Sequence, residues 1–225
     1  MEHCRAQMKV VGGPLMRITR SGMVAPKKTI YLATEGANGT ERFYIKHLCQ
    51  KYGCALQPIP GLSPDEADPV KLVNAAIKFS KTGKKNTHQF EIWVMFDNDN
   101  HAKVVEAFNI VDKYNKRVSP RSLEINMALN SPLVEVWGLL CCGYDKKIPL
   151  SGDRCKSELK HIMPRYDHEH SKEFVYSVMD NGLKSALERA QHMELSAGEC
   201  EQYDISPQAG IYKLVASIVD PNRVK

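Results

Sequence analysis

The sequence predicts an α/β fold, with a mainly parallel sheet, helices on both of its faces and a helical C-terminal extension. Through the first 150 residues, short apolar segments typical of strands alternate with segments whose apolar residues recur at helical spacing. Residues 90–96, "FEIWVMF", are almost continuously apolar, as in a strand that is buried on both faces. After residue 150 the pattern becomes helical only. Together these observations favour a Rossmann-like layered core followed by helices.

The predicted strands share apolar or β-branched residues and end at turn-forming residues. They cover residues 27–34, 54–59, 90–96 and 122–130.

The predicted helices show apolar residues at three- and four-residue spacing, and several are bounded by glycine or proline. They cover residues 40–52, 70–80, 101–116, 131–142, 154–162, 169–192 with a break at Asn181–Gly182, and 206–219.

Three parts of the chain follow from this order. We expect residues 1–26 to form a flexible or edge segment and residues 27–150 to form the α/β core. Residues 151–225 are expected to be a helical extension packed on that core. An apolar helix in this last part fits either the core or the contact face of a homo-oligomer.

Composition is that of an ordinary globular protein. The chain has 225 residues, 43% of them hydrophobic, and a net charge of +5. This mild basicity permits a polyanionic partner, but lysines kept for solubility produce the same charge. Seven cysteines without a CxxC pair argue against a disulfide framework and a standard zinc site. No apolar run approaches the ~20 residues that span a bilayer, so we expect a cytoplasmic protein without membrane contact.

Carboxylates follow two of the predicted strands. Glu35 comes directly after the first strand, and Asp97 and Asp99 come after the central one. Because the carboxyl ends of parallel strands meet at one edge, all three are expected there. Two nearby carboxylates favour a hard cation such as Mg²⁺ or Mn²⁺ between them. The alternative is an ordinary loop, since Asp and Asn also favour turns.

Longer motifs around these residues resemble one protein family. The segments are "TEGANGTERFYIKHL" (34–48), "IWVMFDNDNH" (92–101), "NSPLVEVWGLLCCG" (130–143) and a closing "DISPQAGIYKLVASIV". In this order they resemble the RloB-like family, Toprim-fold proteins of bacterial restriction and phage-defence loci. The resemblance runs from about residue 28 to residue 218 and implies a Toprim-like core.

The resemblance implies a role for four acidic residues. Glu35 corresponds to the Toprim glutamate, a general acid or base that is also a metal ligand, and Asp97 and Asp99 to the metal-binding pair. Glu135 corresponds to a glutamate near the metal, as a ligand or a supporting catalytic group. A solvated glutamate in a first helical turn is the alternative for Glu135.

Further residues are expected to bind nucleic acid or phosphate. They are Gly36, Gly39, His101, Asn130 and Lys172. Helix capping is the alternative for His101 and Asn130. The family's later "Y.K" pattern fits Tyr166, but His168, His170 or Lys172 can each take its basic position.

The function that the resemblance implies is a Mg²⁺-dependent nuclease. Its substrate would be DNA or RNA, tRNA included, and its role antiphage defence with a partner ATPase or another defence protein. The main alternative is a non-catalytic regulatory or binding subunit with the same fold. A small-molecule phosphotransfer enzyme is disfavoured because no nucleotide-binding motif is present.

Overall fold

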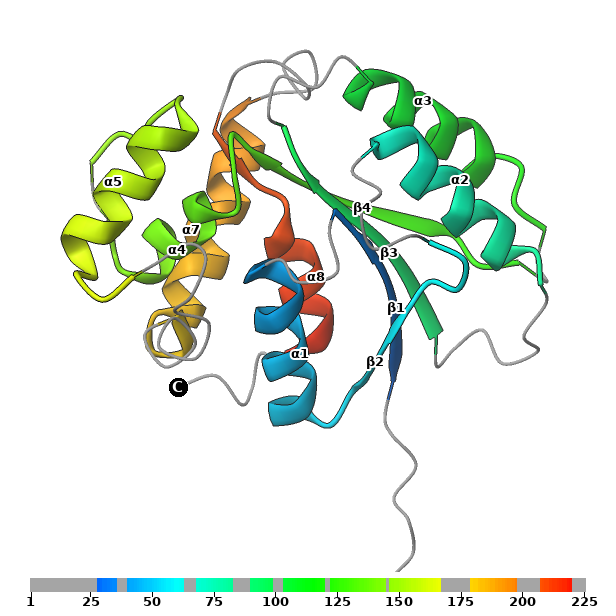
Figure 1. Cartoon of the computed structure of the whole chain (residues 1–225), viewed down its shortest axis with the longest axis horizontal. Coiled ribbons are helices and arrows are strands. Elements are labelled where there is room, and N and C mark those ends of the chain that lie inside the picture. The colour runs from blue at the N-terminus through cyan, green and yellow to red at the C-terminus, as the bar shows by residue number, and fades with distance from the viewer. Residues whose placement is uncertain are drawn as a thin grey trace, which may run out of the picture.

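The computed structural model shows a five-stranded sheet with helices on both faces (Figure 1). It describes residues 28–35, 40–62, 68–82, 90–98, 103–119, 122–144, 146–166, 179–197 and 207–219. The strand order is β2-β1-β3-β4-β5, and all neighbours are parallel except β4 and β5. The predicted α/β class with a mainly parallel sheet is therefore confirmed.

The strands lie close to their predicted positions. They are β1 (Thr29–Thr34), β2 (Ala55–Pro58), β3 (Phe90–Asp97), β4 (Ile125–Ser131) and β5 (Gln208–Ala209).

The described helices fall into two groups, one on each face of the sheet (Figure 1). On one face lie α2 (Pro69–Ser80) and α3 (Val104–Asn115). On the other lie α1 (Thr40–Tyr52), α4 (Glu135–Cys141), α5 (Gly152–Ile162), α7 (Leu183–Ala197) and α8 (Ile211–Ile218). None of these described helices has the length and apolar character needed to cross a membrane.

The central strand β3 explains the two-sided core. Ile92, Val94 and Phe96 belong to the core beneath α2 and α3, whereas Trp93 and Met95 belong to the core on the other face. Side chains alternate along a strand, so Asp97, two positions after Met95, points to the face of Met95. The last residue of β3 is therefore directed toward the group of helices that contains α1 and α4.

Local sequence signals account for several helix ends. Asp68 caps α2, because its side chain accepts hydrogen bonds from the backbone N–H groups of Val70 and Lys71. Pro69 occupies the first turn of that helix, where its missing N–H costs nothing. Gly53 ends α1 with φ +75°, a conformation that glycine adopts without penalty.

Two predicted boundaries near the sheet edge are wrong. The helix expected to begin at Ser131–Pro132 begins at Glu135, because Ser131 is the last residue of β4 and pairs with Gln208. The peptide bond between Ser131 and Pro132 is cis. The chain expected to be helical from residue 206 first adds β5, and α8 follows.

The C-terminal helices pack on the sheet with α1. The predicted break at Asn181–Gly182 is observed: residue 181 is helical, Gly182 is a turn and α7 starts at Leu183. A Cβ atom at Gly182 would lie 1.7 Å from the carbonyl oxygen of Cys141 at the end of α4. Gly182 thus allows the two chain segments to touch. The predicted N-terminal segment 1–26 and the first part of helix 169–192 lie outside the described residues.

Candidate acidic site at the carboxyl edge of the sheet

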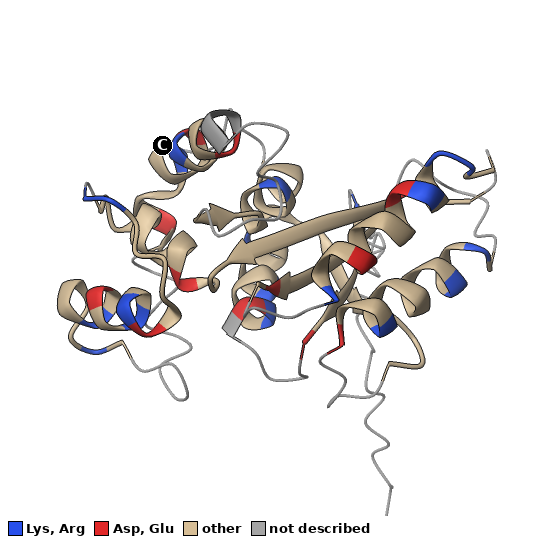
Figure 2. Ribbon diagram, turned by 90° about the horizontal axis from the view of Figure 1, so that it is seen from above, with Lys and Arg blue, Asp and Glu red and all other residues tan. Residues whose placement is uncertain are grey.

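The register of the sheet brings three of the predicted site residues to one edge. Thr34 of β1 pairs with Met95 of β3, so Glu35 and Asp97 lie just beyond this pair on neighbouring strands. Asp97 itself pairs with Asn130 of β4. Neighbouring strands are ~4.8 Å apart. Figure 2, in which the molecule of Figure 1 is seen from above, shows acidic positions around the ends of the strands.

Burial and the negative charges of three glutamates both act on Asp97. The residue is half-buried, and loss of hydration raises the pKa of its carboxyl well above the ordinary 3.8. The carboxylates of Glu41, Glu135 and Glu35 raise that pKa further, in this order of size. No lysine or arginine is among the leading contributors to the shift.

A hydrogen bond partly offsets this repulsion. The side-chain amide of Asn130 donates to Asp97 Oδ1 over 3.1 Å, and it lowers the pKa of the Asp97 carboxyl. The bond fixes one carboxylate oxygen on the face of the sheet that α1 and α4 cover. The hydrogen bond from one neutral amide lowers the pKa of Asp97, but burial and three carboxylates raise it. The electrostatic environment of Asp97 therefore favours a cation.

Asn130 has a second role that joins β4 to α8. It is fully buried, and its Oδ1 accepts a 3.1 Å hydrogen bond from the backbone N–H of Ile211, the first residue of α8. The predicted capping role is therefore observed, but for α8 and not for the helix that follows β4. A Cβ atom at Gly210 would lie 2.2 Å from the carbonyl oxygen of Leu129. Only glycine permits this close approach.

Glu41 was not predicted as a site residue. It lies in the first turn of α1, which begins five residues after Glu35 at the same edge of the sheet. The sequence signal was its position: the first turn of a helix that follows a parallel strand faces the carboxyl edge. By itself the segment "TERF" predicts only the start of a helix.

Glu135 is buried, with only 2% of its surface exposed. Its Oε1 accepts a hydrogen bond of 2.6 Å from the hydroxyl of Tyr166, which is also buried and follows α5. Its negative charge adds to burial in raising the pKa of the Cys155 thiol to about 11. The interpretation of Glu135 as a solvated glutamate is therefore wrong. Burying a carboxylate is costly unless it is hydrogen-bonded or paired, which indicates a specific role.

The chemistry of these groups fits a hard divalent cation. All of them offer oxygen, and Mg²⁺ is usually held by one or two carboxylates together with waters and substrate phosphates. Within the described ranges, no three His, Cys, Asp or Glu side chains are close enough to share one metal ion. Asp99 lies outside these ranges, as do the other predicted residues Gly36, Gly39, His101 and Lys172.

The α/β core with acidic side chains at the carboxyl edge defines a class of proteins rather than one activity. A model of RloB-like proteins matches residues 30–218, which is most of the chain. The protein therefore belongs to the RloB-like family, as the motifs indicated. No curated protein and no solved structure gives a significant match.

Proposed function

We propose that the protein is a Toprim-type nuclease that cleaves phosphodiester bonds in DNA or RNA with Mg²⁺ or Mn²⁺. The observation that supports this most is the position of Asp97 at the end of β3, where its carboxyl is hydrogen-bonded to Asn130 and its pKa is raised by burial and by the charges of Glu41, Glu135 and Glu35. Carboxylates that raise one another's pKa are typical of sites that bind cations.

Asp97 and Asp99 would hold the cation, with Glu35 beside them. When bound, a divalent cation supplies positive charge to the scissile phosphate and lowers the pKa of a water molecule. The amide of Asn130 keeps Asp97 Oδ1 in place, so the carboxylate is oriented before substrate binds.

Glu35 is suited to moving a proton at the reacting oxygen. It stands at the end of β1 and is half-buried, so substrate can reach it while its carboxylate remains close to Asp97. A carboxylate in this position would accept a proton from the attacking water or return one to the leaving oxygen.

Glu135 would act by positioning the other groups. The hydroxyl of Tyr166 orients its carboxylate, and the buried helix α4 limits its movement. Its charge, together with that of Glu41, would keep the site strongly negative and so increase its affinity for a cation.

A cleavage assay tests this proposal. Purified protein would be incubated with plasmid, single-stranded DNA, total RNA and tRNA in Mg²⁺, Mn²⁺ or EDTA. We expect metal-dependent cleavage of one of these polymers, and its loss in Glu35→Gln and Asp97→Asn. Glu91→Gln is the matched control: Glu91 is also on β3 but pairs with Lys28, far from the carboxyl edge.

The family resemblance further supports a role in antiphage defence with a partner, such as an ATPase. Phage plating on cells that carry the gene with its genomic neighbours would test this role. Equal protection by wild type and Asp97→Asn would instead favour a non-catalytic binding subunit.

A further inference from the structure

A shallow pocket, distinct from the acidic edge, lies between the end of α4, the lining residues Tyr144, Lys146 and Ile148, and α7. Its volume is about 400 Å³, and much of it is open to solvent. Leu140, Ile148 and Met193 form its apolar lining. Ile148 and Met193 are only partly buried against the core, so part of their apolar surface remains accessible.

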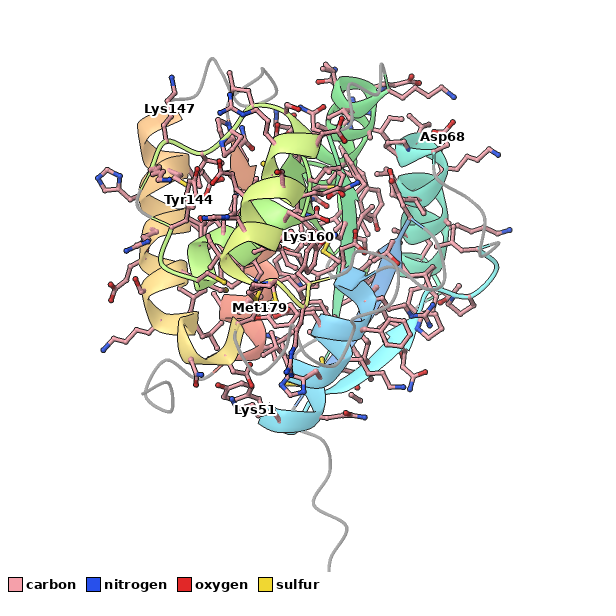
Figure 3. All side chains as sticks on the ribbon, turned by 60° about the vertical axis from the view of Figure 1, so that its left-hand side comes forward. Lys51, Asp68, Tyr144, Lys147, Lys160 and Met179 are labelled. Atoms are coloured by element: carbon pink, nitrogen blue, oxygen red, sulfur yellow. The ribbon has the colours of Figure 1, made fainter. Side chains whose placement is uncertain are left out.

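The rest of the lining is basic or aromatic. Lys146, Arg189 and His192 supply the basic groups, and Tyr144 supplies a ring. Among the residues that the structure describes, no acidic side chain lines the pocket. Figure 3 shows Tyr144 beside α7, with Lys147 at the upper end of the same side. Among the described residues, Lys146 forms no ion pair.

Arg189 is held in place at the pocket by one hydrogen bond. Its Nη1 donates a hydrogen bond of 3.1 Å to the carbonyl oxygen of Tyr144, which joins α7 to the segment after α4. A guanidinium carries five N–H donors in a planar fork, and this bond uses one of them. A fork that the protein already holds in place loses little entropy when it binds a phosphate by two parallel hydrogen bonds.

We propose that this pocket binds a nucleoside phosphate. The base would lie against Leu140, Ile148 and Met193, next to the ring of Tyr144, while the phosphate would contact Arg189 and Lys146. Thioether and aromatic groups both make favourable contacts with a π system. A long-chain anion such as a fatty acid would need a longer apolar lining than these three side chains provide.

The nucleoside phosphate can be a free nucleotide or one unit of a nucleic-acid strand. Leu140 and Glu135 lie near opposite ends of the buried helix α4, so one helix connects the pocket to the acidic edge. The pocket does not depend on the nuclease proposal, since a free nucleotide would bind whatever the acidic edge does.

Binding measured in EDTA tests the pocket separately from cleavage. The probes would be AMP, adenosine, inorganic phosphate and a short single-stranded oligonucleotide. The variant Lys146→Gln/Arg189→Gln removes two charges from the pocket. The control Lys160→Gln/Lys184→Gln removes two charges from exposed lysines elsewhere on α5 and α7 (Lys160 is labelled in Figure 3).

We expect wild type to bind AMP or the oligonucleotide, and the pocket variant to bind at least about tenfold more weakly, as the loss of a charged hydrogen bond implies. The control should change by less than about twofold. Binding of AMP would identify a free nucleotide, and binding of the oligonucleotide alone would identify a strand.

Three results would overturn the inference. The first is that wild type binds neither AMP nor the oligonucleotide. The second is that the pocket variant binds as tightly as wild type, and the third is that wild type binds inorganic phosphate as tightly as AMP. Arg189→Gln also removes the bond to Tyr144, so Lys146→Glu serves as a second variant. Lys146 is exposed and the change should leave the fold intact. Retained binding in this folded variant would equally contradict the inference.

Discussion

The hydroxyl of Tyr166 donates a 2.6 Å hydrogen bond to Glu135 Oε1 inside the core, between residues 31 positions apart. The bond joins the first residue of α4 to the turn after α5. A buried carboxylate that lost this donor would be left poorly solvated. The orientation of Glu135 therefore depends on a residue outside the α/β core.

Tyr166→Phe should lower the free energy of unfolding by about 1–3 kcal/mol, because the aromatic ring stays but the buried acceptor loses its donor. Urea denaturation would measure the change. Tyr212→Phe is the matched control, since the hydroxyl of Tyr212 donates to Glu194, whose side chain is 38% exposed. A loss below about 1 kcal/mol is expected there because water replaces the donor. Equal losses in both variants would contradict the role given to Tyr166.

Asp97→Asn should stabilise the protein in EDTA at neutral pH. Burial raises the pKa of Asp97, so its ionised form is disfavoured in the folded state. Each pKa unit of this shift corresponds to about 1.4 kcal/mol. Asparagine keeps an oxygen that accepts the hydrogen bond from Asn130.

The pH dependence of this effect has a defined sign. A carboxyl whose folded-state pKa is raised contributes stability below its unfolded-state pKa of about 4, and that contribution is lost as pH rises through the folded-state pKa. The variant should thus match wild type near pH 4 and exceed it increasingly toward pH 7.5. Urea denaturation across this range would measure the difference. If the variant were less stable than wild type at neutral pH, the ionised Asp97 carboxylate would not be destabilising in the folded protein, and the expectation would be wrong.

Gly210→Ala should disturb the position of the Asp97 side chain, although residue 210 is not part of the sequence-predicted site. Its Cβ would lie 2.2 Å from the carbonyl oxygen of Leu129, so the start of α8 must move. That movement would break the bond from Ile211 to Asn130 and release Asp97 Oδ1. We expect a loss of about 1–3 kcal/mol in stability and weaker binding of Mn²⁺.

Gly61→Ala provides the contrast. Gly61 has φ +84° and open space around its Cβ position, so only a backbone penalty of about 1–2 kcal/mol is expected. Binding of Mn²⁺ should be unchanged in this variant. Weaker binding in both variants would show that general destabilisation, and not displacement of α8, affects the edge.

The parts of the fold predicted best depend on local patterns. The strand at 90–96 was identifiable because a strand buried on both faces is almost entirely apolar. By contrast, β5 has two residues and forms by pairing Ala209 with Asn130, a contact between segments far apart in the chain. No local pattern predicts such a strand.

The same distinction holds for the candidate site. Glu35 and Asp97 were predictable because each follows a strand, and strand ends in a parallel sheet meet at one edge. The burial of Glu135 was not predictable from the sequence, because it results from packing of α4 against helices that come later in the chain. The contribution of Glu41 likewise required knowledge of where α1 begins relative to Asp97.

The central claim is that the carboxylates around Asp97 bind a divalent cation. Binding of Mn²⁺ followed by electron paramagnetic resonance tests it directly, without a substrate. We expect saturable binding by wild type, its loss or severe weakening in Asp97→Asn and Glu35→Gln, and its retention in Glu91→Gln. Binding that is absent from wild type, or that survives unchanged in Asp97→Asn, would contradict the claim.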